Sequence, residues 1–253
     1  MTGKTQLDEN LFAARLQDIF ETVEQRCIPK FTSYLDERQV FLVQEYLKHC
    51  HKENWMLWGG YDHAQRQMLG VFPDYLEPEE AAFPIAALTF RFRKEDTLSH
   101  RDFLGSLMAL QIKREAVGDI LVSEGNCILF VTDKVEPLIC SEITKIGRTG
   151  VKIEKGITAS LSREEQFREI SGTVASLRLD CVVSLMTGKS REKACELIQA
   201  GLVSLNHRET ESNSAAVEAG DILSVRGFGK AKLSEQLRET KKGRIYITLL
   251  KYL

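Results

Sequence analysis

The amino-acid sequence predicts an α+β protein in three parts. Apolar residues recur at helical spacing between residues 7 and 50, and the period then shortens to that of strands. Residues 85–154 alternate strand-like runs with helical segments, and residues 178–226 combine two short amphipathic helices with a pair of strands. We expect an N-terminal domain of helices and a hairpin at 1–73, a middle domain at 74–156, a connector at 157–177 and a closing domain at 178–253.

Charge is distributed unevenly along the chain. The net charge of the whole chain is −2. Residues 178–253 contain 13 Lys and Arg against 9 Asp and Glu, whereas residues 1–177 contain 21 Lys and Arg against 27 Asp and Glu. Apolar content of 43% and charged content of 28% are ordinary for a folded globular protein. The basic excess of the closing domain indicates an anionic partner, and the modest size of the excess requires clustered cations for strong binding.

Cysteine usage predicts a reducing compartment. The six cysteines show no C-x-x-C pair, and several lie among apolar neighbours. The first residues lack the apolar run of a signal peptide, and no stretch approaches the roughly 20 apolar residues that a membrane helix needs. We therefore expect reduced thiols, a cytoplasmic location and no membrane partner.

The N-terminal domain is predicted from its periodicity. One helix is expected at Leu7–Val23 and a second at Ser33–Cys50. Trp55–Trp58 and Met68–Phe72 have the pattern of two strands, with Gly59 and Gly60 at the turn between them. Three prolines and an acidic segment follow, so we place the domain boundary near Pro73.

The middle domain shows a recognisable order of elements. We expect strands and helices, in chain order, at Ile85–Arg93, Leu98–Leu110 (capped by Ser99), Asp119–Val122, Cys127–Thr132, Asp133–Ile146 (capped by Asp133) and Val151–Glu154. This order, strand, helix, strand, strand, helix, strand, is the split βαβ order of ferredoxin-like and RNA-recognition-motif (RRM) domains.

Two interpretations of the middle sheet stay open on sequence. RRM sheets expose aromatic residues for base stacking. Phe90, Phe92 and Phe130 are either such a platform or part of a core. Likewise, Lys113 and Arg114 either touch phosphates or are solvated surface charges.

The closing domain is expected to begin with two helices. The connector before them is polar, and Ser162, Glu164 and Glu165 begin what we interpret as a short helix. In the first helix of the domain, apolar residues share one face, and Gly188 stands where a terminating glycine belongs. Ser190 is predicted to cap the second helix, which Gly201 ends.

Cations surround the start of that second helix. Lys189, Arg191 and Lys193 lie at a helix N-terminus, where backbone N–H groups and the helix dipole favour anions. A solvated surface would carry Asp or Glu there, and Glu192 is the single residue that does. The pattern predicts a phosphate site, and we expect substitution of Arg191 and Lys193 to leave stability nearly intact.

The order of parts resembles the S4 RNA-binding domain. The matching segments are RLD at 178–180, SR at 190–191, LIQAGLVSLN at 197–206 and GD at 220–221. His207 departs from the family, which has glycine after the Asn. The resemblance implies a C-terminal S4 (αL-type) domain that holds structured RNA by its phosphates. Together with the basic tail, the expected RNA-binding residues are Arg178, Lys189, Ser190, Arg191, Lys193, Asn206, His207, Arg208, Arg226, Lys230, Lys232, Lys241, Lys242 and Arg244.

An S4 domain behind an RRM-like domain is similar to the YlmH-like S4 proteins of bacterial division clusters. This resemblance covers nearly the whole chain. It implies a non-catalytic protein that binds the large ribosomal subunit, near ribosomal RNA and peptidyl-tRNA, in quality control of stalled translation. We expect a monomer without cofactor or metal.

Two alternatives belong to other classes of protein. The first is an RNA-modifying enzyme, of pseudouridine synthase or methyltransferase type, that uses the S4 domain as a handle. Asp180 already starts the S4 helix, and WGGY at 58–61 and GRTG at 147–150 lack cofactor-loop spacing. His49, Cys50 and His51 point apart on a helix and cannot share a metal. The second alternative is an adaptor that binds proteins through its acidic N-terminal part.

Overall fold

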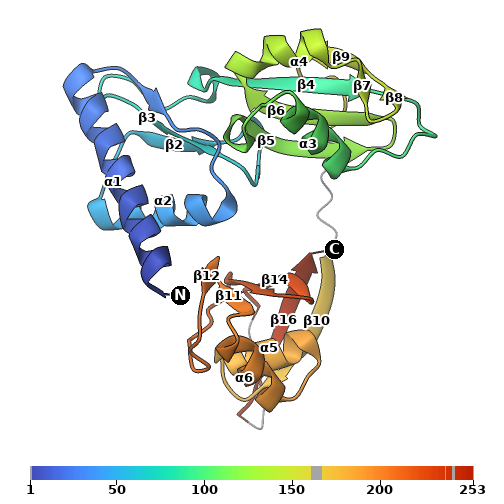
Figure 1. The fold of residues 1–253 in the computed structure, drawn as a ribbon. Helices are drawn as coiled ribbons and strands as arrows, with labels where there is room; N and C mark the ends of the chain where they lie inside the picture. The colour runs from blue at the N-terminus through green and yellow to red at the C-terminus, as the bar shows by residue number, and fades with distance from the viewer. Residues whose placement is uncertain (1, 161–166, 237, 241–242, 253) are drawn as a thin grey trace. The chain divides into compact units, whose positions relative to one another are not determined.

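A computed structural model gives the structure of the protein, which is a mixed α+β fold as predicted (Figure 1). It describes residues 2–160, 167–236, 238–240 and 243–252. The chain divides into two compact units, residues 1–163 (unit 1) and 164–253 (unit 2). Among the described residues, no helix is long and apolar enough to span a membrane.

Unit 1 contains a three-stranded sheet and a four-stranded sheet. Its strands and helices are α1 (Thr2–Arg26), β1 (Lys30–Phe31), α2 (Glu37–Cys50), β2 (Trp55–Trp58), β3 (Met68–Val71), η1 (Glu80–Ala82), β4 (Ile85–Arg91), α3 (His100–Ala109), η2 (Arg114–Ala116), β5 (Val117–Ser123), β6 (Asn126–Thr132), η3 (Asp133–Val135), α4 (Glu136–Glu142), β7 (Lys145–Ile146), β8 (Thr149–Gly150) and β9 (Lys152–Lys155).

The helix predicted at Ser33–Cys50 begins later than expected. Asp36 caps α2: its carboxylate accepts a hydrogen bond from Gln39 N (2.9 Å), and the Gln39 side chain accepts one from Asp36 N (2.9 Å). Leu35 meanwhile pairs with Gln67 in a β-bridge. Residue 33 is therefore not helical, because the chain first adds to the small sheet, whose order is β1-β3-β2.

The middle sheet has the order β5-β6-β4-β9, with every pair antiparallel. The predicted succession of strand, helix, strand, strand, helix, strand is confirmed. Two details were wrong. Asp133 starts a 3₁₀ turn and caps no helix, and α4 ends at Glu142, so that Ile146 lies in the short strand β7.

Both faces of the middle sheet are covered. Phe90 packs edge-on against Phe103 of α3, with ring centroids 5.4 Å apart. On the opposite face Phe130 stacks on Tyr61, with centroids 4.9 Å apart. Phe90 and Phe130 are each 0% exposed. The core interpretation is confirmed for these rings, because a buried ring cannot stack on a base.

The face that carries Phe130 is covered by residues from the first 73. Tyr34, Tyr61 and Phe72 form one core cluster with Phe83 and Phe130. The boundary predicted near Pro73 thus lies inside a compact unit that shares a core across it.

A buried carboxylate joins the two halves of unit 1. Asp119, on β5, accepts hydrogen bonds from Tyr61 Oη (2.7 Å), Gln65 N (2.7 Å) and Arg66 N (3.2 Å). Arg114 lies nearby and donates to the carbonyl oxygens of Val117 and Gly118. Its guanidinium therefore has a structural role, which the phosphate interpretation did not anticipate.

Unit 2 is one curved sheet with two helices on one face (Figure 1). Its elements are β10 (Phe167–Val174), α5 (Leu179–Thr187), α6 (Arg191–Gln199), β11 (Val203–Leu205), β12 (Arg208–Glu209), β13 (Ile222–Val225), β14 (Gly229–Leu233), β15 (Arg238–Glu239) and β16 (Ile245–Tyr252). The sheet order is β10-β16-β14-β13-β11-β12, and β15 pairs with β16.

The predicted connector contains a strand of this sheet. All eight residues of β10 pair with β16, which makes residues 167–174 part of unit 2. The polar sequence concealed the strand because its outer side chains are mostly hydrophilic. The short helix predicted at Ser162, Glu164 and Glu165 lies outside the described residues.

We predict that Asp119→Asn destabilises unit 1 by about 2–4 kcal/mol, because an amide nitrogen cannot accept the hydrogen bonds that the carboxylate accepts. Urea unfolding followed by tryptophan fluorescence measures this selectively, since both tryptophans of the chain, Trp55 and Trp58, lie in β2. The exposed Asp133→Asn is the control and should change stability by less than about 0.5 kcal/mol. If Asp119→Asn lowered the free energy of unfolding no more than Asp133→Asn does, the structural role assigned to the Asp119 carboxylate would be contradicted.

Candidate nucleic-acid interface

The junction between α5 and α6 has the predicted caps. Gly188 ends α5 in the left-handed conformation, with φ of 66°. Ser190 caps α6, and its hydroxyl accepts a hydrogen bond from Lys193 N (3.3 Å). Ser190 and Gly188 thus turn the chain so that the basic residues 189, 191 and 193 are exposed together.

Asp180 holds two of the predicted cations. Arg191 contacts its carboxylate through Nε (2.9 Å) and a terminal nitrogen (2.7 Å), and Arg178 contacts it through two nitrogens at 3.3 Å. The Asp180 side chain is 2% exposed, whereas those of Arg178 and Arg191 are 43% and 54% exposed. The carboxylate therefore lies beneath two guanidinium groups that reach solvent.

These contacts decide the charge state of Asp180. Burial by itself would raise its pKa, but hydrogen bonds from Arg191 and then Arg178 outweigh burial and hold the pKa below its usual value. Asp180 is thus ionised at neutral pH. The ion pair argues against the expectation that substitution of Arg191 leaves stability nearly intact, because loss of Arg191 leaves a buried carboxylate with one cation fewer.

The two lysines have different neighbours. Lys193 forms an exposed ion pair with Glu196, one turn further along α6. Lys189 Nζ lies 5.5 Å from the ring centroid of Phe228, in the turn between β13 and β14. The structure thereby brings the helix junction beside that turn, which begins after the exposed Arg226.

The turn at Asn206 is built by its side chain. Asn206 donates to Asp221 Oδ1 (2.8 Å) and accepts from Ile222 N (2.9 Å). Asn206 and His207 have φ of 48° and 63°, so a histidine adopts the left-handed conformation expected of glycine. Asn206 has a structural role in the turn, while Arg208 beyond it is exposed.

The cations of the tail are spread over the sheet. Lys230 Nζ lies 4.9 Å from the ring centroid of Tyr252, and Lys232 lies on the same strand, β14. Arg244 donates to the carbonyl oxygen of Thr173 (2.9 Å). Lys241 and Lys242 lie outside the described residues.

Sequence reasoning missed the partners of these cations. Local sequence marks Asp180 as a helix start, and it does not connect Phe228 or Tyr252 with a lysine. The alternation in IYITLLKY was a usable signal, because it places Tyr246 and Tyr252 opposite the buried Ile247 and Leu249.

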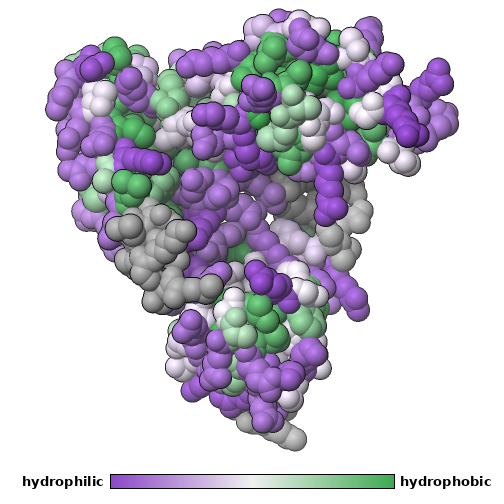
Figure 2. Space-filling model, in the orientation of Figure 1, coloured by the Kyte–Doolittle hydropathy of each residue, from purple (hydrophilic) through white to green (hydrophobic). Residues whose placement is uncertain are grey.

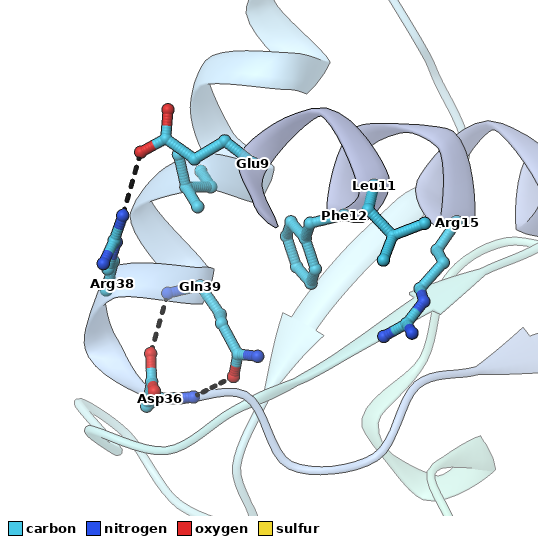
Figure 3. Close-up of a pocket in the computed structure, with 8 residues that line it drawn as sticks. Glu9, Leu11, Phe12, Arg15, Asp36, Arg38 and Gln39 are labelled. Carbon is cyan, nitrogen blue, oxygen red and sulfur yellow. Dashed lines mark hydrogen bonds and ion pairs between the residues drawn. The ribbon is translucent and has the colours of Figure 1, made fainter. Parts of the chain in front are cut away.

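A separate hollow lies between α1 and α2 of unit 1 (Figure 3). Glu9 and Arg38 pair across its edge at 3.1 Å, and Asp36 and Gln39 within it form the cap of α2. Hydrophilic residues cover most of the molecular face seen in Figure 2. Within the described ranges no three His, Cys, Asp or Glu side chains are placed to hold a metal ion.

We predict that Arg191→Ala lowers the protection of α5 and α6 against hydrogen exchange, because it removes the nearer partner of a buried carboxylate. Lys193→Ala is the matched control and should leave that protection close to the wild-type level, since its ion pair is exposed. Hydrogen exchange of peptides from α5 and α6 measures both. Equal protection in the two variants would show that Asp180 does not depend on Arg191.

The lowered pKa of Asp180 predicts acid sensitivity. Its stabilising contribution is fully present above the pKa of an unfolded aspartate, about 4, and is lost as the pH falls through the lower folded value. Urea unfolding of unit 2, followed by amide NMR signals of α5, should show stability falling below about pH 4 in the wild type. The fall should be shallower in Asp180→Asn, and an identical pH dependence would refute the linkage.

Comparisons with known proteins connect the chain to a protein family. Residues 78–159 match the family model described as "Putative RNA-binding domain in YlmH". The ribosome-associated protein quality control protein P2 of Bacillus subtilis (strain 168) is 33% identical over 243 residues, which are 95% of this chain and 94% of that protein.

A solved structure shows the same fold over part of the chain. The cell division protein ylmH from Streptococcus pneumoniae superposes with a TM-score of 0.52 and 21% identity, covering 59% of this chain and 91% of that one. Because the relative from B. subtilis aligns over almost the full length of both proteins, this chain belongs to the YlmH family of that quality control protein.

Proposed function

We propose that this protein binds structured RNA on the large ribosomal subunit, close to ribosomal RNA and peptidyl-tRNA, and acts in quality control of stalled translation. The observation that carries the proposal is the pair of exposed guanidinium groups, Arg178 and Arg191, fixed over the buried Asp180. Its biological setting comes from the relative in B. subtilis, which is named a ribosome-associated quality control protein.

The arginine pair has the chemistry of a phosphate site. A guanidinium carries five N–H donors, and Asp180 uses the Nε side of each group. The remaining donors can bind phosphate oxygens without reorganisation, because the ion pairs already hold the side chains. Lys189 and Lys193, both exposed beside them, add charge at the same helix end.

Unit 2 performs this role as the S4 domain in our proposal. The proposed interface comprises the helix junction, Arg208 beyond the hairpin turn, and the tail cations from Arg226 onward. Contacts of this kind position RNA by its backbone and select shape more than sequence.

The middle part, which we propose to be RRM-like, must contact RNA differently from a stacking sheet. Its matched family model is described as RNA-binding, yet both faces of the sheet are covered. RNA contacts there would use the rim, where Arg93, Lys94 and Lys113 are exposed.

We propose no catalysis and no cofactor. The candidate catalytic aspartate of an RNA-modifying enzyme, Asp180, is 2% exposed and paired with two arginines. A carboxylate in that state cannot reach a nucleobase. Maps of modified nucleotides in RNA from cells with and without the protein should therefore be identical, and a reproducibly lost modification would favour the enzyme.

We predict that Lys189→Ala and Lys193→Ala each weaken binding to large subunits roughly three- to tenfold at moderate salt and reduce the salt slope by about one phosphate contact. Co-sedimentation and fluorescence anisotropy over a salt series measure this. Folding should be unchanged because both side chains are exposed.

Lys48→Ala provides the matched control. Lys48 forms an exposed ion pair with Glu45 at a spacing of three residues, as Lys193 does with Glu196, but on α2 of unit 1. If Lys189→Ala and Lys193→Ala bound large subunits as tightly as Lys48→Ala does, the proposed interface would be contradicted.

A further inference from the structure

The sheet of unit 2 has a second face, opposite α5 and α6. Ile247 and Leu249 of β16 are 0% exposed in the core beneath the helices. Because side chains alternate along a strand, Tyr246, Leu250 and Tyr252 belong to the other side. We call this side the outer face, and its relevant residues are Phe167, Lys230, Lys232, Tyr246, Leu250 and Tyr252.

Aromatic rings and cations lie side by side on the outer face. Phe167 is opposite Tyr252 in the β10–β16 register, and their ring centroids are 5.0 Å apart at 65°. From β14, Lys230 Nζ lies 4.9 Å from the centre of the same Tyr252 ring, and Lys232 is opposite Leu250. Three neighbouring strands therefore contribute to one aromatic and basic surface.

This composition departs from that of an ordinary solvated face. The exposed side of an antiparallel sheet normally carries polar residues. Here Tyr246 is 40% exposed, and Phe167, Leu250 and Tyr252 are only partly buried. The helices already fill the opposite side, so these rings are not needed to complete the core.

The charge on this face is complementary to a polyanion. On β10, β14, β15 and β16 the outer face carries Lys230, Lys232 and Arg238, and Arg238 is opposite Tyr246. The acidic residues of this face are Glu169, opposite Leu250, and Glu209, which lies on β12 at the far edge of the sheet. Rings that offer a stacking surface, flanked by lysines, are the combination that binds unpaired nucleic acid.

We propose that the outer face binds an unpaired RNA segment, stacking bases on Tyr246 and Tyr252 and contacting phosphates through Lys230 and Lys232. The two tyrosines are six positions apart on an extended strand, which corresponds to about 20 Å. The segment therefore spans several nucleotides. This inference rests on the proposed function in that the ligand is RNA, and it adds a second site with a different chemistry on the same unit.

The test uses the full chain and a fluorescein-labelled single-stranded oligouridine of about 12 nucleotides. Tyr246→Thr keeps strand propensity, and Tyr252→Leu keeps apolar packing. Each variant should weaken oligouridine binding about tenfold. Tyr252→Phe keeps the ring and should bind as the wild type does. Tyr75→Thr, at a tyrosine of unit 1 that is 68% exposed, is the matched control.

A second measurement locates the bound strand. Oligouridine containing 4-thiouridine should crosslink to the peptide that holds Tyr246 and Tyr252. Crosslinks confined to unit 1, or affinities of both tyrosine variants within twofold of the wild type, would overturn the proposal.

Failure of this inference can be told apart from failure of the proposed function. Lys189→Ala should weaken binding to a labelled RNA hairpin but leave oligouridine binding unchanged, and the tyrosine variants should do the reverse. A protein that binds the RNA hairpin but not oligouridine would contradict only the outer-face site. A protein that binds oligouridine but not the hairpin would contradict only the proposed function. If the tyrosine variants lose co-sedimentation with ribosomes but keep their affinity for oligouridine, the outer face binds a protein, which also overturns the inference.

Discussion

The buried carboxylate of Asp180 is the constraint on which the candidate interface depends. A carboxylate removed from water needs hydrogen-bond donors or cations as partners, and here they are Arg178 and Arg191, one before α5 and one in the first turn of α6. A cation at a helix N-terminus is unfavourable, but the nearby carboxylate offsets this cost for Arg191. One side chain thereby ties the two helices together and orients the groups that we assign to phosphate.

The two units use their sheets in opposite ways. In unit 1 both faces of the middle sheet are buried, one beneath α3 and α4 and the other beneath residues of the first 73. In unit 2 the helices cover one face and leave the other partly exposed. Aromatic residues in the strands therefore have different roles. Phe130 packs in the core of unit 1, whereas Tyr246 of unit 2 is exposed to solvent.

Family membership and the physical features of the interface are complementary. Similarity to the B. subtilis protein spans the chain and supplies the biological setting for the proposal. It does not say which atoms contact RNA. Ion pairs, exposure and caps supply that detail. They separate the exposed cations among the predicted residues, such as Lys189 and Arg208, from residues whose side chains cap a helix or build a turn, such as Ser190 and Asn206.

Local sequence determined the elements that depend on near neighbours. The caps of α5 and α6, the hairpin strands, and the element order of the middle domain follow from periodicity and turn chemistry, which act over a few residues. Tertiary structure alone decided what each element meets: β10 is a strand because β16 lies beside it, Phe130 is buried because Tyr61 stacks on it, and Arg191 is structural because Asp180 lies 11 positions earlier in the chain but 2.7 Å away in space. Such partners are distant in sequence, so neither composition nor spacing could reveal them.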